Sequence, residues 1–375
     1  MGNLEQKIKD TFTYLHTHAE ISWEETNTTS YIANILQENG CEVTTFSDHT
    51  GVIAQLGNFK KNLPVVAVRA DIDALWQEVG GVFQANHSCG HDAHMAIVLG
   101  LLWKLKETPE LMDNIAVKFI FQPAEETGKG ALKLVEKGAV EDVDYLFGIH
   151  LRPQQETQMH HATPVIVHGA TKMYQAKIKG HDAHGARPHL NSNAIEVGAQ
   201  IVHLLNKIHL DPTIPHSVKM TKFQAGSKST NIIPGNAIFA LDMRAQTNEA
   251  MEELDKQVIQ IFTAIESLNN IEIEIIEKRG IAAAKINSEA ISIMESAISN
   301  VLGSENVDPP LLTPGGDDFH FYTIKKPELK ATMLGLGCEL TPGLHHPQMT
   351  FNKDALINGV HILFKAVQQV YHNNE

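Results

Sequence analysis

The sequence predicts an α/β protein with a main domain, built on a central mixed sheet flanked by helices, and an inserted α+β domain of ferredoxin-like arrangement. Helical patterns alternate with short apolar runs over the first 150 residues, a β-α-β-β-α-β succession follows, and a helical pattern returns near residue 288. We therefore expect residues 1–167 and 279–375 to form the main domain. Residues 168–278 should form the insertion.

The first elements follow from the spacing of apolar side chains. Apolar residues recur at helical spacing over residues 4–19 and 26–39, and Asn39-Gly40 is typical of a helix end. Short apolar runs come next, and such runs are typical of buried strands. We expect strands at 41–45, 52–56, 65–70, 116–121 and 145–150, and a helix at 94–106.

The pattern changes after residue 150, where a polar stretch separates the two parts of the chain. In the insertion we expect strands at 173–179, 217–224, 237–244 and 271–276, and helices at 193–207 and 249–268. About a hundred residues in this order form a compact α+β unit. After the insertion we expect a helix at 288–301, a strand at 332–336 and a helix at 355–371.

The composition is that of a globular protein and argues against several classes of function. The chain has 375 residues, of which 43% are hydrophobic and 20% charged, so it can form two domains with a sizeable core. Its formal net charge of −14 argues against nucleic acid or an anionic membrane as a partner, because phosphate binding needs clustered Lys and Arg. The expected partner is a small-molecule substrate.

The sequence also predicts a cytoplasmic location. The N-terminal residues have no apolar signal-peptide region, and the longest apolar run, 96–103, is too short to cross a bilayer. The three cysteines, Cys41, Cys89 and Cys338, are an odd number without a paired pattern, which is typical of a reducing compartment. We expect no disulfides.

The segment 87–94 (HSCGHDAH) is dense in side chains that bind metal ions. It lies immediately before an apolar helical pattern, so a rigid element can fix its side chains. Thiolate and neutral imidazole are preferred ligands of zinc and similar divalent ions, and an aspartate beside a histidine can orient its ring. A single Cys-x-His pair, taken alone, favours a buried thiol beside a surface histidine over a metal site.

Three other segments supply further metal donors. Glu125 and Glu126 follow the strand expected at 116–121, where open α/β sheets place their ligands. One of two adjacent carboxylates can bind a metal ion while the other transfers protons. His150 ends another expected strand, and His345 lies in a loop at 343–347. Taken alone, each histidine could be an ordinary loop residue and the two glutamates an ordinary surface pair, but the four segments together predict a metal site.

On these residues the chain resembles the M20 metallopeptidases, and within them the amidohydrolase branch of aminoacylase-like and auxin-conjugate hydrolase enzymes. The resemblance covers nearly the whole chain, and its motifs are specific in combination. The matching pieces are residues 15–22 (LHTHAEIS), 69–75 (RADIDAL), 89–94 (CGHDAH), 121–126 (FQPAEE) and 344–347 (LHHP).

The resemblance implies a metal-dependent amidohydrolase with two divalent ions per subunit. The implied metal ligands are Cys89, His91, Glu126, His150 and His345. Glu125 is the implied general base and acid, and a deprotonated Cys89 can bridge the two ions. Zinc and manganese are the expected metals, with cobalt and nickel as alternatives, since availability often decides which metal such a site holds.

The resemblance further implies that the insertion is a lid or dimerisation domain. It matches His184 to a histidine that reaches the active site of the neighbouring subunit and stabilises the oxyanion. It matches Asn231 and Arg244 to positions that hold substrate, and Arg suits a carboxylate. The residues alone also allow a surface turn for His184, and a helix cap or surface ion pair for the other two. A homodimer or a larger homo-oligomer is expected.

The chain departs from the family pattern at three places. Trp76 follows Asp73-Ala74-Leu75 where the family usually has proline, and residues 181–183 (HDA) stand where relatives tend to have glycines. Asp317 replaces a glutamate near the last ligand. The differences at Trp76 and at residues 181–183 predict a substrate pocket of different shape.

The expected reaction is hydrolysis of the amide bond of small N-acyl amino acids, such as N-acetyl amino acids, by metal-activated water with Glu125 transferring protons. A dipeptidase or aminopeptidase using the same site is the alternative. The two enzymes differ in whether they accept an acyl group or a free α-amine. The third hypothesis is a non-catalytic binding protein that retains the fold.

Overall fold

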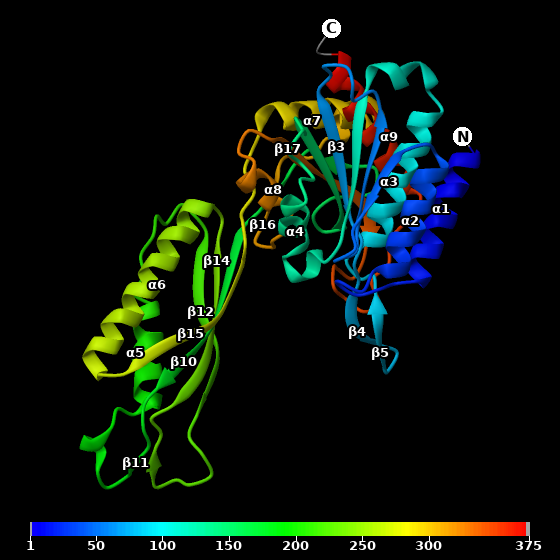
Figure 1. Ribbon diagram of the computed structural model, residues 1–375. Helices are drawn as coiled ribbons and strands as arrows, with labels where there is room; N and C mark the ends of the chain where they lie inside the picture. Colours follow the sequence, from blue (N-terminus) through cyan, green and yellow to red (C-terminus); the bar gives the residue numbers. More distant parts are fainter. Residues whose placement is uncertain (1, 373–375) are drawn as a thin grey trace. The chain divides into compact units, whose positions relative to one another are not determined.

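The computed structural model describes residues 2–372, and the chain divides into two units (Figure 1). Unit 1 comprises Met1–Val167, Lys285–Leu312 and Asp318–Glu375, of which Met1 and residues 373–375 lie outside the described residues. Unit 2 comprises His168–Ala284 and Thr313–Asp317. It extends beyond the expected boundary at residue 278, because its last strand, β15 (Glu272–Ile281), stays paired with a neighbouring strand through Ile281.

A seven-stranded sheet forms the centre of unit 1. Its four central strands pair in parallel, and antiparallel pairs continue the sheet at both edges, so the expected mixed sheet is confirmed. The strand order is β1 (Glu42–Thr45), β2 (Val52–Gly57), β6 (Ala116–Gln122), β3 (Val65–Asp71), β7 (Tyr145–Pro153), β17 (Lys330–Leu340) and β8 (Ala162–Thr163). The parallel strands β6, β3, β7 and β17 have their carboxyl ends at the same edge of the sheet.

Helices cover both faces of this sheet, which explains why its strands are apolar on both sides. Val66 and Val68 of β3 belong to the larger core, whereas Ala67 between them belongs to a second core on the opposite face. The larger core includes α1 (Gly2–Thr17), α2 (Thr26–Glu38), α3 (His91–Lys106), α7 (Ser288–Leu302) and α9 (Ala355–His372). The second core includes α4 (Gly130–Glu136) and α8 (His320–Lys325). Helix α3 packs against α1 and α9 and is buried along almost its whole length.

A hairpin that the sequence analysis did not predict follows β3. It consists of β4 (Leu75–Val79) and β5 (Val82–Asn86), joined by Gly80 and Gly81 at φ 60° and 85°. Two successive residues with positive φ form the tight turn that matches the twist of paired strands, and glycine adopts it without steric cost. Short elements complete unit 1, namely η1 (Pro109–Asn114), η2 (Glu125–Thr127) and η4 (Ser304–Asn306).

Unit 2 has a four-stranded antiparallel sheet in the order β12 (His216–Ala225), β14 (Ala237–Ala245), β10 (Ala170–Lys179) and β15. Helices α5 (Ala194–Leu205) and α6 (Asn248–Asn269) pack on one face, over the buried alternate residues of β10 and β14. This strand order with the β-α-β-β-α-β succession is the ferredoxin-like arrangement. The unit also contains β11 (Ala183–His184), β13 (Ile232–Ile233) and η3 (Pro188–Leu190), while β9 (Ile166–His168) and β16 (Leu311–Thr313) each span a boundary between the units.

Within residues 2–372, no helix is both long enough and apolar enough to cross a membrane.

Candidate metal centre

The parallel strands of unit 1 deliver the expected metal donors to one edge of the sheet. β6 ends at Gln122 and leads into η2, which carries Glu126, while His150 lies in β7 and His345 follows β17. Cys89 precedes α3 in the chain. Because the carboxyl ends of parallel strands meet at one edge, residues far apart in sequence can come together there.

Five donor side chains converge in this place. The ligand atoms of Cys89, His91 and His150 all lie within 4.8 Å of one another, and so do those of Cys89, Glu126 and His345. His345 Nε2 lies 3.3 Å from Cys89 Sγ and 3.4 Å from Glu126 Oε1, and His150 Nε2 lies 3.6 Å from the same Sγ. The donors therefore form two groups of three that share the Cys89 thiol.

Backbone carbonyls fix the ring orientation of two of these histidines. His91 Nδ1 lies 2.8 Å from the carbonyl oxygen of Asp73, and His150 Nδ1 lies 2.7 Å from that of Leu151. A carbonyl can only accept, so Nδ1 carries the proton in both rings and the lone pair of a neutral ring is on Nε2. The Nε2 atoms face the other donors, since that of His150 lies 3.6 Å from Cys89 Sγ and that of His91 lies 3.9 Å from Glu126 Oε1.

The donor set fits divalent cations. Among residues 2–372, the buried atoms His91 Nε2 and Glu126 Oε1 have no hydrogen-bond partner, which is costly for buried polar atoms unless a ligand satisfies them. Thiolate, imidazole and carboxylate together suit zinc and neighbouring transition metals. Burial, followed by the charge of Glu126, raises the pKa of the Cys89 thiol, and a bound cation offsets this by displacing the proton.

Glu125 lies beside the donors but outside the two groups that share Cys89. A carboxylate oxygen of Glu125 is within 4.8 Å of donor atoms of His91 and Glu126, and the residue is only 8% exposed. Its Oε1 accepts a hydrogen bond from the backbone N–H of Asp318 at 3.4 Å. A carboxylate in this position can exchange a proton with a molecule held at the metal centre.

A buried network of charges that the sequence analysis did not assign supports the site. Asp71 Oδ1 lies 2.7 Å from His94 Nδ1, and His94 Nε2 accepts the N–H of Leu151 at 3.0 Å, so Nδ1 of this ring donates to Asp71. Arg69 donates to the other oxygen of Asp71 at 2.6 Å and to Asp318 at 3.0 Å. The signal that could have revealed these residues is the spacing Arg-x-Asp-x-Asp at the end of an apolar strand.

Asp92 does not orient the metal-binding histidines, although it stands beside His91 in the sequence. Its Oδ2 lies 2.7 Å from Nδ1 of His16, and its Oδ1 accepts the N–H of Ala93. The helical position of Asp92 turns its side chain toward α1, whereas Asp71 and Asp73 approach from the end of β3. The expectation that the neighbouring aspartate orients the ring is therefore wrong.

The pKa values of two buried carboxyl groups near the site, Asp71 and Glu25, are shifted in opposite directions. Burial acts to raise the pKa of Asp71, but the charges of His91 and Arg69 outweigh burial and hold it well below its usual range. Glu25 has no such compensating charges, so burial raises its pKa to about 7 from an ordinary value of 4.5.

The raised pKa of Glu25 predicts a pH-dependent stability. Between about pH 4.5 and 7 the folded protein binds more protons at this carboxyl group than the unfolded chain does, so the free energy of unfolding falls as the pH rises. The Glu25→Gln variant has no titrating group at this position, so its free energy of unfolding, relative to that of the wild type, should rise by up to about 3 kcal/mol as the pH increases from about 5 to 8. Urea unfolding of both proteins at the two pH values measures this gain, and a difference that stays constant with pH would contradict it.

The structure places the other expected site residues in unit 2, at two ends of its sheet. β11 pairs with β13, which sets His184 opposite Ile232, and the N–H of Gly185 donates to the carbonyl of Asn231 at 2.7 Å. His184 and Asn231 are therefore neighbours on two paired, exposed segments, of which the one that carries β11 follows the end of β10 (Figure 1). Arg244 lies at the other end of the sheet, opposite Thr171 near the start of β10, and pairs with Asp242 (Nε to Oδ1, 3.0 Å).

The residues that depart from the family pattern have contrasting surroundings. Trp76 lies on β4 and is 60% exposed, although Gln77 beside it anchors the hairpin by donating to the carbonyl of His345 at 2.9 Å. Asp317 is buried and belongs to unit 2. His181 and Asp182 are exposed in the loop that carries His184, and Asp182 accepts the N–H of Gly235 at 2.9 Å.

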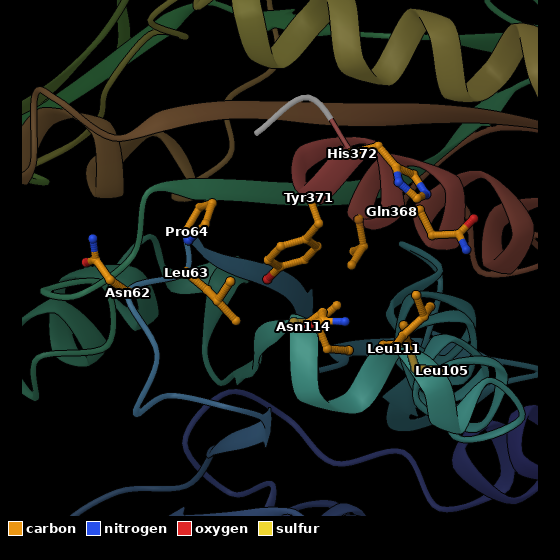
Figure 2. A pocket seen from close by; sticks show the side chains of 11 residues that line it. Asn62, Leu63, Pro64, Leu105, Leu111, Asn114, Gln368, Tyr371 and His372 are labelled. Carbon is orange, nitrogen blue, oxygen red and sulfur yellow. The ribbon is translucent and has the colours of Figure 1, made fainter. Parts of the chain in front are cut away.

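A mainly apolar cavity elsewhere in unit 1 contains none of the expected site residues. It encloses about 220 Å³ between the end of α9, η1 and the segment before β3 (Figure 2). Tyr371 lines it, and the hydroxyl group of this residue donates to the carbonyl of Ala116 and accepts its N–H. This cavity lacks a group of metal donors and is separate from the metal centre.

Comparison with known proteins decides the family. Residues 67–369 match Peptidase family M20/M25/M40. The chain belongs to this family. Its class is that of a metal-dependent amidohydrolase, as the sequence predicts.

Related proteins of known or assigned activity cover most of the chain. An N-acetyl-L-cysteine deacetylase from Bacillus subtilis is 27% identical over 100% of this chain and 91% of its own length. IAA-amino acid hydrolase ILR1-like 4 from Arabidopsis thaliana is 30% identical over 82% of this chain and 72% of its own length. The crystal structure of the YXEP protein of Bacillus subtilis, described as a dinuclear metal-binding peptidase of the M20 family, superposes with a TM-score of 0.82. It is 26% identical and covers 99% of both chains.

Proposed function

We propose that this protein hydrolyses the amide bond of small N-acyl amino acids, with N-acetyl amino acids as the first class to test. The observation that carries the proposal is the arrangement of the site, in which two groups of three metal donors share Cys89 and Glu125 lies beside them. The names of the deacetylase and the IAA-amino acid hydrolase support this substrate class, because both act on an acyl group joined to an amino acid.

The five convergent side chains are the proposed metal ligands. Cys89, His91 and His150 would hold one ion and Cys89, Glu126 and His345 would hold the other, because the Cys89 thiol belongs to both donor groups. When bound, the two cations supply Lewis acidity to the substrate carbonyl and to the attacking water. Zinc or manganese is the proposed metal, with cobalt and nickel to be compared.

Glu125 moves the proton in the proposed reaction. Its carboxylate takes a proton from the attacking water as the new C–O bond forms, and it gives that proton to the amide nitrogen as the C–N bond breaks. Glu126 carries the same functional group, but it lies within 3.4 Å of His345 Nε2 and is assigned to metal binding. The two adjacent carboxylates thus have different roles.

His184 is proposed to stabilise the oxyanion. Its Nδ1 accepts the N–H of Ala186 at 3.0 Å, so the neutral ring carries its proton on Nε2 and can donate from there. Arg244 is proposed to bind the substrate carboxylate and Asn231 to hold the substrate.

The positions of His184 and Arg244 within unit 2 support a homodimer or larger oligomer. Most of the length of β10 separates them along the sheet, which corresponds to roughly 25 Å or more. A small N-acyl amino acid cannot contact both residues of one copy at that separation. We therefore propose that one comes from the chain that supplies the metal ligands and the other from a partner subunit, with unit 2 as the lid and dimerisation domain.

A cytoplasmic location completes the proposal. The three cysteines Cys41, Cys89 and Cys338 are all free thiols, and Cys89 must stay reduced to bind metal.

The proposed function is tested by assaying reconstituted enzyme. Protein purified without chelators is analysed for bound metal, stripped, and reloaded with zinc, manganese, cobalt or nickel. We expect about two ions per chain, and release of free amino acids from a panel of N-acetyl amino acids only in the loaded protein. Hydrolysis confined to dipeptides with a free α-amine would move the assignment to a dipeptidase or aminopeptidase. Stoichiometric metal without hydrolysis of either panel would indicate a binding protein.

A further inference from the structure

Glu25 is a buried side chain that the proposed reaction does not use. It has no solvent exposure and lies immediately before helix α2. It does not cap that helix, because the carboxylate of Glu20 accepts the N–H groups of Asn27 at 3.1 Å and Thr28 at 2.8 Å. The Glu25 carboxyl group instead contacts a different part of unit 1.

Both oxygens of Glu25 are engaged beside the turn that carries the adjacent glutamates. Oε1 accepts the N–H of Ala124 at 2.9 Å, and Oε2 accepts the hydroxyl group of Thr50 at 2.5 Å. The segment around Thr50 is itself fixed, since a Cβ atom at Gly51 would come within 2.7 Å of Pro123 Cδ. Glu25 thus joins the loop before β2 to the residue that precedes Glu125.

Ala124 has a backbone conformation that needs external support. Its φ and ψ are 53° and 40°, in the left-handed region that is disfavoured for residues with a Cβ atom. Pro123 before it has no N–H to donate. From the other side, a Cβ atom at Gly130 would come within 1.6 Å of the Pro123 carbonyl oxygen, so α4 packs closely against the turn.

The carboxylate of Asp73 accepts the next backbone N–H groups of the same turn. Asp73 accepts the N–H of Glu125 with Oδ1 and that of Glu126 with Oδ2, both at 3.1 Å. The hydroxyl group of Ser22 donates to the same side chain at 2.6 Å. Two buried carboxyl groups therefore hold three successive N–H groups, and the backbone that carries both glutamates is fixed at each residue.

We propose that Glu25 is a positioning residue, which holds the left-handed turn at Ala124 and thereby aims Glu125 and Glu126 at the metal centre. The inference rests on the proposed function for the roles of those two glutamates. Glu25 bonds to the backbone of Ala124 and acts only through the turn.

The positioning role requires an acceptor oxygen and not a charge. A protonated Glu25 can accept from Ala124 with its carbonyl oxygen and donate to the Thr50 hydroxyl, which also accepts hydrogen bonds. Gln at this position offers the same pair of groups, whereas Leu offers neither. Activity should therefore depend on the hydrogen-bonding side chain and not on the ionisation of Glu25.

The test compares Glu25→Gln, Glu25→Leu and Glu20→Ala with the wild type. Each protein is assayed for kcat and KM on an N-acetyl amino acid over a range of pH, and its apo form is titrated with zinc. We expect Glu25→Gln to keep kcat, its pH profile and zinc affinity. Glu25→Leu should lower kcat and zinc affinity each by about 10- to 100-fold with little change in KM, as loss of groups that orient metal ligands does.

Glu20→Ala is the matched control, because Glu20 lies in the same loop but caps α2. It should lower the melting temperature while leaving kcat and zinc affinity unchanged. If Glu25→Leu does not fold, Thr50→Val removes the partner of Oε2 and should lower both quantities by a smaller factor.

Three results would overturn the proposal. They are a Glu25→Leu protein with wild-type kcat and zinc affinity, a Glu25→Gln protein as impaired as Glu25→Leu, and a loss of activity in Glu20→Ala that follows its melting temperature. A wild-type protein that hydrolyses no N-acyl amino acid would instead refute the proposed function. The zinc titrations would still test Glu25, because Glu126 depends on the same turn.

Discussion

Replacing Glu125 with Gln is expected to lower kcat for N-acyl amino acid hydrolysis by about 10²- to 10⁴-fold while both metal ions stay bound. Gln has nearly the same shape and can still accept the N–H of Asp318, but it cannot take a proton from water. Because Glu125 lies outside the two donor groups that share Cys89, its charge is not needed to hold the ions. Metal analysis and steady-state kinetics on the same preparation measure the two effects.

The adjacent residue provides the control for this prediction. Glu126→Gln makes the same chemical change one position along the turn, yet Glu126 belongs to the donor group with Cys89 and His345. We expect this variant to lose zinc affinity, and its activity to fall for that reason. Equal metal loss in both variants, or full activity in Glu125→Gln, would contradict the division of roles between the two carboxylates.

Mixing two inactive variants is expected to restore activity. Glu125→Gln lacks the base but keeps His184, and His184→Ala has the reverse defect. If His184 acts on the site of a partner subunit, a mixed dimer contains one site with both groups intact. Random reassortment of equal amounts gives such a site at about a quarter of all positions. Subunits are exchanged by dilution or mild denaturant before the assay. The activity of the mixture should then rise from that of the separate variants toward about a quarter of the wild-type activity.

His189→Ala serves as the control in the mixing experiment, because His189 is an exposed histidine of the same loop with no assigned role. This variant should be active without mixing. If the variants at 125 and 184 exchange subunits, as shown with a tagged copy, and still give no activity, His184 either acts within its own chain or does not act at all.

The sequence predicts the donors better than it predicts what orients them. Cys89, His91 and Glu126 stand in short, donor-rich segments, so their chemistry is visible without a structure, and the structure brings them together with His150 and His345. The groups that orient these donors are not visible in the sequence. The Nδ1 protons of His91 and His150 are fixed by main-chain carbonyls, which no residue type identifies in advance.

The limits of prediction for the fold also have physical causes. The parallel core of unit 1 follows from apolar runs that are buried on both faces. The β4–β5 hairpin was missed because apolar and polar residue types do not alternate along its two strands, which are exposed or half-exposed, although Gly80-Gly81 is a turn signal. The boundary expected at 278 falls within β15, whose polar end continues to pair with β10 through Ile281.

The place of β17 in the sheet constrains the order in which the chain can fold during synthesis. β17 lies between β7 and β8, although it is separated from both in sequence by every strand of unit 2. A nascent chain therefore makes β10 to β15 while the side of β7 that will pair with β17 has no partner. An unpaired strand edge in an unfinished sheet can pair with another chain, so the ribosome-bound protein is exposed to aggregation until residues 330–340 emerge.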